Sequence, residues 1–313
     1  MHFHDSKSPQ QALAFFTHIY NSQIERRYRK LTIELGERVH PFILAEVGTP
    51  IPKNRLGETH FFDFNRLRSG VNTFGDRVIP GNEHLVALDF YRNYPGFEYY
   101  WFIEYDVVFS GNWAVLLDAV RNDSSDLLAG HIRSLPEEPK WVWWDSLNIP
   151  DGALPRSSWL RAFFPVYRIS HQGLKAVEDC VRAGWTGHFE ALIPTAIRSA
   201  SLSISDIGGD GARTPGERRH RFYSSRSFNA GASHRAGTLR HRPTHAFRLR
   251  RNAIFHPVKP SSWTSQDKTL NVSSVQGALL RCLVSSHYNL LCLWSLFDRK
   301  LSKLARVVSQ KRI

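Results

Sequence analysis

Two acidic side chains end an apolar run, Trp101-Phe102-Ile103-Glu104-Tyr105-Asp106. In an extended segment, residues two apart point to the same side, so Glu104 and Asp106 can converge on one point. Two carboxylates together can hold a hard divalent cation such as Mg²⁺ or Mn²⁺, and that cation can stabilise a diphosphate as a leaving group. The pair therefore indicates metal-assisted chemistry on a phosphorylated substrate. The alternative is that both acids only end a strand and face solvent.

The elements that must position this pair are predicted from apolar runs, helical spacing and breakers. Strands are expected over residues 12–19, 41–47, 99–109, 126–132, 162–169 and 202–207. Helices are expected over residues 22–35 (with Ser22 as N-cap), 83–94, 112–121, 170–183 and 190–200, and residues 48–77 are expected to be rich in loops. The β-α-β start favours a parallel sheet. In open α/β sheets, ligands bind at the carboxyl ends of the strands, which is where the acid pair lies.

The segment around the pair resembles the D-x-D motif of GT-A-type glycosyltransferases, here as E-Y-D. The likeness extends over residues 10–260 and includes the runs Ser110-Gly111-Asn112-Trp113, Gly187-His188-Phe189-Glu190 and Phe255-His256-Pro257-Val258-Lys259. It departs from the usual pattern at Glu104, where Asp is commoner. The resemblance implies an α/β, GT-A-like fold with a mixed, mostly parallel central sheet flanked by helices. It also implies a nucleotide-sugar donor, for which a UDP-sugar is the preferred candidate, and Mn²⁺ or Mg²⁺ as cofactor.

Two downstream residues take roles that the resemblance implies. Glu190 falls where a catalytic base would deprotonate the acceptor hydroxyl, with His188 as a second candidate, and His256 falls where a ligand would close the metal site. Lys259 can pair with the diphosphate as a point charge. The alternatives are a helix-start acid for Glu190 and an ordinary turn for His256 and Lys259.

Further binding residues are expected on both sides of the donor. In the related fold the nucleotide lies over the edge after the first strand, which brings in Thr17, Arg26, Arg27, Arg29 and Lys30. Sugar rings present C–H faces that suit aromatic planes, so an acceptor platform is predicted at Trp141, Trp143 and Trp144. The alternatives are solvated helix charges for the first group and core packing for the tryptophans.

Charge and composition narrow the partners. The formal net charge is +13, and residues 211–259 hold eleven Arg and one Lys against one acid. This favours anionic partners; without a nucleic-acid motif, a nucleotide donor and an anionic membrane surface are preferred to RNA or DNA. Three scattered cysteines predict no disulfide framework or zinc site. With no secretory signal or apolar run of spanning length, we expect a cytoplasmic protein, peripheral on the inner face of the membrane.

The organisation expected is a catalytic domain over residues 10–260, with a basic loop or lid at 211–250, and an amphipathic helical segment at 261–313. That last segment can lie on a membrane or pack on the catalytic domain. The predicted function is transfer of a sugar from a nucleotide-diphosphate donor to a hydroxyl of a glycan or lipid-linked acceptor, with inversion. The alternatives are a metal-dependent phosphoester or glycoside hydrolase, and a basic non-enzymatic protein that binds nucleic acid or membrane.

Overall fold

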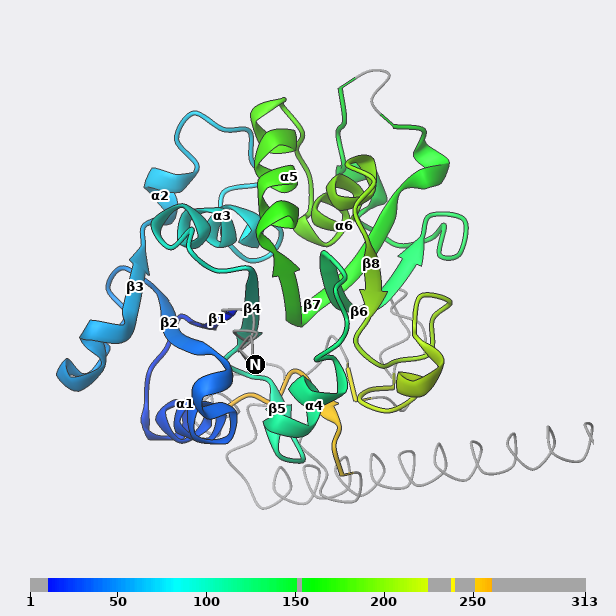
Figure 1. Ribbon diagram of the computed structural model, residues 1–313. Helices are drawn as coiled ribbons and strands as arrows, with labels where there is room; N and C mark the ends of the chain where they lie inside the picture. Colours follow the sequence, from blue (N-terminus) through cyan, green and yellow to red (C-terminus); the bar gives the residue numbers. More distant parts are fainter. Residues whose placement is uncertain (1–10, 151–153, 225–237, 240–250, 261–313) are drawn as a thin grey trace, which may run out of the picture.

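A computed structural model describes residues 11–150, 154–224, 238–239 and 251–260 of this chain. Its core is a seven-stranded sheet of order β3-β2-β1-β4-β7-β6-β8, and β5 pairs with β9 in a second, two-stranded sheet (Figure 1). The strands are β1 Gln11–Thr17, β2 His40–Glu46, β3 Thr59–Phe62, β4 Tyr99–Glu104, β5 Val108–Phe109, β6 Leu127–Ser134, β7 Leu160–Ser170, β8 Ile204–Asp206 and β9 Ile254–Phe255. The helices are α1 Ser22–Leu35, α2 Phe64–Leu67, α3 Glu83–Asn93, α4 Trp113–Ala119, α5 His171–Arg182 and α6 Phe189–Ser199.

The central sheet is mixed and mostly parallel, as predicted. Strands β3, β2, β1 and β4 pair in parallel, and β8 pairs in parallel with β6. The antiparallel member is β7, which runs against both β4 and β6. The carboxyl ends of β1, β2 and β4 therefore meet at one edge, and β7 enters the same region from the opposite direction.

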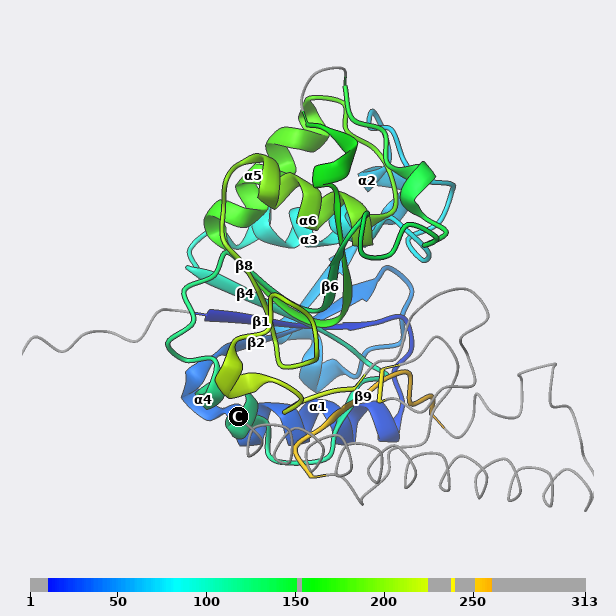
Figure 2. The ribbon, with the colours of Figure 1, turned by 90° about the vertical axis from the view of Figure 1, so that its right-hand side faces the viewer.

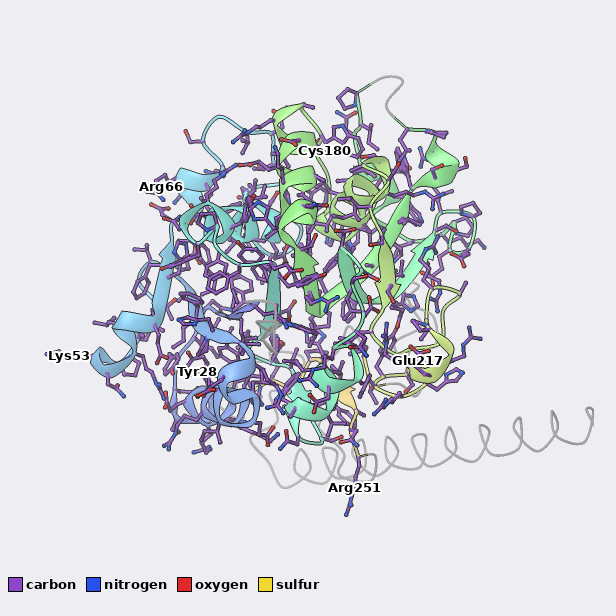
Figure 3. All side chains as sticks on the ribbon, in the orientation of Figure 1. Tyr28, Lys53, Arg66, Cys180, Glu217 and Arg251 are labelled. Atoms are coloured by element: carbon purple, nitrogen blue, oxygen red, sulfur yellow. The ribbon has the colours of Figure 1, made fainter. Side chains whose placement is uncertain are left out.

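Helices cover both faces of this sheet. Figures 1 and 2 show α3, α5 and α6 on one face and α1 and α4 on the other. Alternate residues of β1 divide between the two cores, because Ala12 and Ala14 pack with the first group of helices while Leu13 and Phe15 pack with the second. Tyr28, labelled on α1 in Figure 3, is fully buried, and its ring centroid lies 5.5 Å from that of Phe15 on β1.

Local signals explain most helix boundaries, with one correction. Asn21, not Ser22, caps α1: its side chain accepts hydrogen bonds from the backbone N–H groups of Gln23 (2.9 Å) and Ile24 (3.0 Å). Asn21 has extended backbone angles, whereas Ser22 already belongs to the helix, so only Asn21 can reach back over the first turn. Ser170 caps α5 as predicted, accepting from Gly173 N at 2.9 Å.

The prediction for residues 48–77 was incomplete, and the predictions for the C-terminal segment and for most of the basic loop fall on residues that the structure does not describe. The stretch 48–77 is not all loop, since it contains β3 at the sheet edge and the short helix α2. The C-terminal segment 261–313 lies outside the described residues, as do 225–237 and 240–250 of the basic loop. Among the described residues, no helix has both the length and the apolar composition needed to cross a membrane.

Candidate active site

The chain turns sharply where the sequence suggested one long strand over 99–109. Strand β4 ends at Glu104, and Tyr105 and Asp106 form a turn before β5 begins at Val108. The turn is fixed to the sheet because Tyr105 N donates to the Phe16 carbonyl at 2.9 Å. Glu104 and Asp106 do converge, but the turn brings them together rather than the alternation of a strand.

A segment from far along the chain returns to this turn. Residues 251–260, called the return segment below, pair through β9 with β5, and Val258 N donates to the Asp106 carbonyl at 2.7 Å. Arg27 on α1 joins the two parts by donating from Nη1 to the carbonyls of Tyr105 (2.9 Å) and Val258 (2.8 Å). The pairing carries His256 to the two carboxylates.

Three side chains form a potential metal site at this point. One ligand atom each from Glu104, Asp106 and His256 lies within 4.8 Å of the others. His256 Nε2 is 3.0 Å from Glu104 Oε2 and 3.3 Å from Asp106 Oδ1. Asp106 Oδ1 is buried and has no well-formed hydrogen bond within the described part of the chain. Two carboxylates and an imidazole, with one carboxylate oxygen that makes no well-formed hydrogen bond to the described residues, fit a divalent cation.

Groups of opposite charge lie in contact in this cluster, with carboxylates beside His256 and Lys259. Burial opposes the positive charge on His256, yet Asp106 and Glu104 outweigh it and raise the pKa of His256 to about 10. Burial also acts to raise the pKa of Asp106, but His256 and Lys259 outweigh it and hold that pKa well below its ordinary value. Lys259 Nζ lies 2.6 Å from Asp106 Oδ2 and 3.1 Å from Tyr105 Oη. Asp106 is therefore ionised, as a metal ligand must be, whereas His256 is protonated against the two carboxylates and would have to release that proton to bind a cation.

Glu190 lies close enough to this cluster to interact with it electrostatically. It is the second residue of α6, and its carboxylate is buried. Burial raises its pKa to about 7, with a further contribution from Glu104, while Arg161 and His256 oppose the rise. His188 caps α6, its Nδ1 accepting from Glu190 N at 3.3 Å. A carboxylate with a pKa near neutrality is suited to accept a proton from a hydroxyl.

Arg161 on β7 is a residue that the sequence reading missed. It is fully buried, its Nη2 lies 4.0 Å from Glu190 Oε2, and its Nη1 donates to Glu138 Oε2 at 3.3 Å. Its guanidinium lies 4.4 Å from the Trp141 ring centroid. A charged residue beside the long apolar run at the start of β7 was the signal that could have drawn attention to it.

The three predicted acceptor tryptophans are not equivalent. Trp141 and Trp144 are buried with 4% and 2% exposure, and their ring centroids are 5.0 Å apart. Trp143 is partly exposed and stacks on His188 at 5.0 Å with an interplanar angle of 9°. Trp141 and Trp144 therefore present no free face in this structure, and the acceptor prediction narrows to Trp143.

The residues predicted to contact the nucleotide lie in different environments, some buried beside the turn and others exposed on α1. Thr17 ends β1 beside the turn and is buried, with its hydroxyl donating to the Ile19 carbonyl. Arg26 is exposed on α1, and Lys30 pairs with Glu34 at 2.8 Å and donates to the Gly111 carbonyl at 2.8 Å. The arginine of α1 that contacts the turn and the return segment is Arg27.

The described start of the predicted basic loop, residues 211–224, packs against the rest of the predicted catalytic domain through Arg218. Arg218 is buried, pairs with Asp123, and donates to Ser205 Oγ at 2.8 Å. Arg251, by contrast, is exposed and projects away from the sheet (Figure 3).

Comparisons with known proteins give a limited likeness. No protein-family model matches the sequence, and no curated protein matches it. A solved structure described as a candidate glucose-1-phosphate thymidylyltransferase from Bacillus anthracis, in complex with a sucrose, is 9% identical with a TM-score of 0.36, and the match covers 63% of this chain and 86% of that one. Glucosyl-3-phosphoglycerate synthase from Mycobacterium tuberculosis, in complex with Mg²⁺ and UDP, is 8% identical with a TM-score of 0.37, over 63% and 68% of the two chains. TM-scores this low carry no argument about this chain's activity, which must come from the site itself.

Proposed function

We propose that this chain is a glycosyltransferase that moves a sugar from a nucleotide-diphosphate donor to a hydroxyl group of an acceptor. The observation that carries the proposal is the convergence of Glu104, Asp106 and His256, from segments about 150 residues apart, at the carboxyl edge of a mostly parallel sheet. Substrates bind at this edge in open α/β sheets. The GT-A likeness of the sequence around these residues is consistent with this placement.

Each charged group has a role in this reaction. Glu104, Asp106 and His256 would hold Mg²⁺ or Mn²⁺, which when bound supplies positive charge to a diphosphate leaving group. Lys259, 2.6 Å from Asp106, adds a second positive charge on the same side. Asp106 and His256 are buried, which strengthens the interactions of their charges.

Glu190 would serve as the base. The acceptor oxygen attacks the anomeric carbon as the bond from that carbon to the diphosphate oxygen breaks, and the bonding electrons leave with the diphosphate. The acceptor proton passes to the Glu190 carboxylate, whose pKa of about 7 allows it to be ionised near neutral pH. Direct displacement of this kind inverts the anomeric configuration.

The acceptor is proposed to be a glycan or a lipid-linked saccharide. Trp143, stacked on His188 next to Glu190, is the partly exposed aromatic residue placed to contact it. The excess of arginine over residues 211–259 suits an anionic membrane surface on the cytoplasmic side.

The test is calorimetric titration of the full chain with UDP, GDP, dTDP and CMP and their sugars, with and without Mn²⁺ or Mg²⁺. The wild-type protein should bind one nucleoside diphosphate in a divalent-dependent way. Asp106→Asn should weaken this binding more than the ~10–100-fold that loss of an outer-shell partner costs. Asp118→Asn is the control, because Asp118 is half exposed on α4 and pairs with Arg38.

Glu190→Gln should retain donor binding and lose transfer. Binding that ignores the cation, or an Asp106→Asn variant that binds like the wild type, would refute the proposed metal role. Donor hydrolysis without transfer to any acceptor would identify a hydrolase instead. Salt-sensitive RNA binding without binding of any nucleotide sugar would identify a basic adaptor.

A further inference from the structure

The segment between β6 and β7 carries the three tryptophans and begins close to the proposed base. Its residues 135–148 are called the tryptophan loop below, and Glu138 lies near its start. The Glu138 carbonyl accepts hydrogen bonds from Trp144 Nε1 at 2.7 Å and from Trp141 N at 3.2 Å. Glu138 therefore stabilises the shape of the loop through its main chain, which leaves its carboxylate available for other partners.

The Glu138 carboxylate binds the buried guanidinium of Arg161. Arg161 Nη1 donates to Glu138 Oε2 at 3.3 Å, and His131 Nε2 lies 2.9 Å from Glu138 Oε1. Burial lowers the pKa of His131 to about 4, so His131 is neutral near pH 7 and its Nε2–H donates to the carboxylate. Burial acts to raise the pKa of Glu138, but the hydrogen bond with His131 and the charge of Arg161 outweigh burial and lower that pKa. Glu138 is therefore an ionised partner for Arg161.

Arg161 lies closer to Glu138 than to Glu190. Its Nη2 is 4.0 Å from Glu190 Oε2, which is longer than a hydrogen bond. A guanidinium in direct contact with a carboxyl group lowers its pKa by about one to three units. Because Arg161 is shared between two carboxyl groups, it interacts with Glu190 less strongly than it would with Glu190 alone.

The tryptophan loop also contacts the start of α6, two residues before the base. Ser146 Oγ accepts a hydrogen bond from His188 N at 3.0 Å, and Trp143 stacks on the His188 ring. Asn148 and Thr186 exchange backbone hydrogen bonds of 2.8 and 3.0 Å. The loop therefore reaches the base by two routes, the buried guanidinium and the cap of the helix.

Other charged groups act on Glu190 from three further elements. They are Glu104 at the end of β4, Glu83 at the start of α3 and His256 in the return segment. Glu83 and Glu104 also line one small cavity. None of these three lies in the tryptophan loop. Within the described part of the chain, Arg161 is therefore the charged group that connects the loop to the base.

We propose that Glu138 is a positioning residue for the base: it holds Arg161 against the tryptophan loop and so prevents the guanidinium from pairing closely with Glu190. The inference rests on the proposed function, in which Glu190 accepts the proton of the acceptor hydroxyl. It adds a residue that the metal, base and acceptor roles do not use, and it joins the loop that carries Trp143 to the base.

The experiment is carbon-13 NMR of the full chain labelled at glutamate, with Glu138→Gln as the variant and the Glu190 resonance assigned through Glu190→Gln. Glu138→Gln keeps the size of the side chain and removes its charge, so Arg161 should move towards Glu190. The titration midpoint of Glu190, near pH 7 in the wild-type protein, should then fall by about one pH unit.

Two further variants serve as controls. Glu137→Gln removes the same charge from the next residue, whose carboxylate accepts from Ser134 N and lies 3.6 Å from Arg213, and it should leave the midpoint unchanged. Glu138→Asp keeps the charge but weakens the contact with Arg161, so its midpoint should lie between those of the wild type and Glu138→Gln. It is also the variant to measure if Glu138→Gln does not fold.

A direct effect of the Glu138 charge on the base is separated from an effect through Arg161 by a double-mutant cycle. In the Arg161→Gln background, Glu138→Gln should no longer shift the midpoint of Glu190. An equal fall in both backgrounds, or no fall in the otherwise wild-type protein, would overturn the positioning role.

Failure of the proposed function is observed separately, because the midpoints are measured without substrate. Calorimetry of the wild-type protein with UDP, GDP, dTDP and CMP in Mg²⁺ tests that function. If none of them binds, the proposed function fails, and the role assigned to Glu138 fails with it. If one of them binds but the midpoints do not shift as expected, the positioning role is wrong and the proposed function stands.

Discussion

The buried ion pair of Arg161 and Glu190 allows a quantitative test of the base assignment through Arg161→Gln. Burial raises the pKa of Glu190 from 4.5 to about 7, and Arg161 limits that rise. The charged groups are 4.0 Å apart. At that distance two unit charges interact by about 4 kcal/mol for an effective dielectric constant of ~20, which corresponds to about three pH units. Because relaxation and water will replace part of this interaction, we expect a titration midpoint about one to three pH units higher in the variant.

Carbon-13 NMR of glutamate-labelled protein can measure this midpoint without knowledge of the acceptor. The Glu190 carboxyl resonance is identified by its loss in Glu190→Gln. In the wild-type protein it should titrate near pH 7, and in Arg161→Gln at a clearly higher pH. Arg161→Lys keeps the charge and should return the midpoint towards the wild-type value. It also serves as the folded alternative if Arg161→Gln, which removes one of the two buried partners of Glu138, does not fold.

Stability should depend on pH in the corresponding direction. The folded-state pKa of Glu190 is raised, so the folded protein holds this proton over a range where the unfolded chain has lost it. The free energy of unfolding should therefore fall by about 3 kcal/mol between pH 4.5 and pH 7 because of Glu190, and Glu190→Gln should lack this part of the decrease. A wild-type midpoint near 4.5, or one unchanged in Arg161→Gln, would refute the electrostatic reasoning.

Two further predictions test the packing of the tryptophans and the position of the return segment. Trp144→Ala should lower the free energy of unfolding by about 3–5 kcal/mol, because Trp144 is buried. Trp143→Ala should change the free energy of unfolding little and should instead weaken acceptor binding. Equal losses of stability of the two variants in chemical denaturation would contradict this. Gly111→Ala should weaken divalent-dependent nucleotide binding by about 10-fold, because its new Cβ would lie 2.0 Å from Asn252 Oδ1 and displace the return segment. Gly96→Ala, where a Cβ meets nothing within 4 Å, is the control, and equal calorimetric affinities in the two variants would contradict the prediction.

The fold was largely predictable because its signals are local. The β-α-β start, the caps of the helices and the apolar run before Glu104 each depend on residues close in sequence. The antiparallel direction of β7 was not predictable in this way, since strand direction is set by which partner a strand meets. The short strand β3 was missed because four residues at a sheet edge carry almost no periodic pattern.

The site could be predicted only in part, for a related reason. Glu104 and Asp106 are two residues apart, so their proximity is visible in the sequence, whereas His256 reaches them only through the pairing of β5 with β9. Without the resemblance to GT-A enzymes, no local pattern would have connected His256 to the acid pair. Glu83 was not among the predicted site residues, because an acid at the first position of a helix is favoured whether or not it faces a pocket.

The carboxylates at this edge of the sheet are divided by their surroundings into two chemical kinds. Asp106 lies against His256 and Lys259, and these cations keep its pKa low despite burial. Glu190 is buried and Glu83 is partly buried, both with less compensation, so their pKa values are raised, to about 7 for Glu190 and well above the ordinary value for Glu83. Groups that ionise readily are suited to hold a cation, and groups that keep a proton near neutral pH are suited to exchange it or donate it in a hydrogen bond. A site that only bound a metal would need the first kind alone. The presence of the second kind beside it is what the proposed reaction requires, because there Glu190 takes the proton of the acceptor hydroxyl.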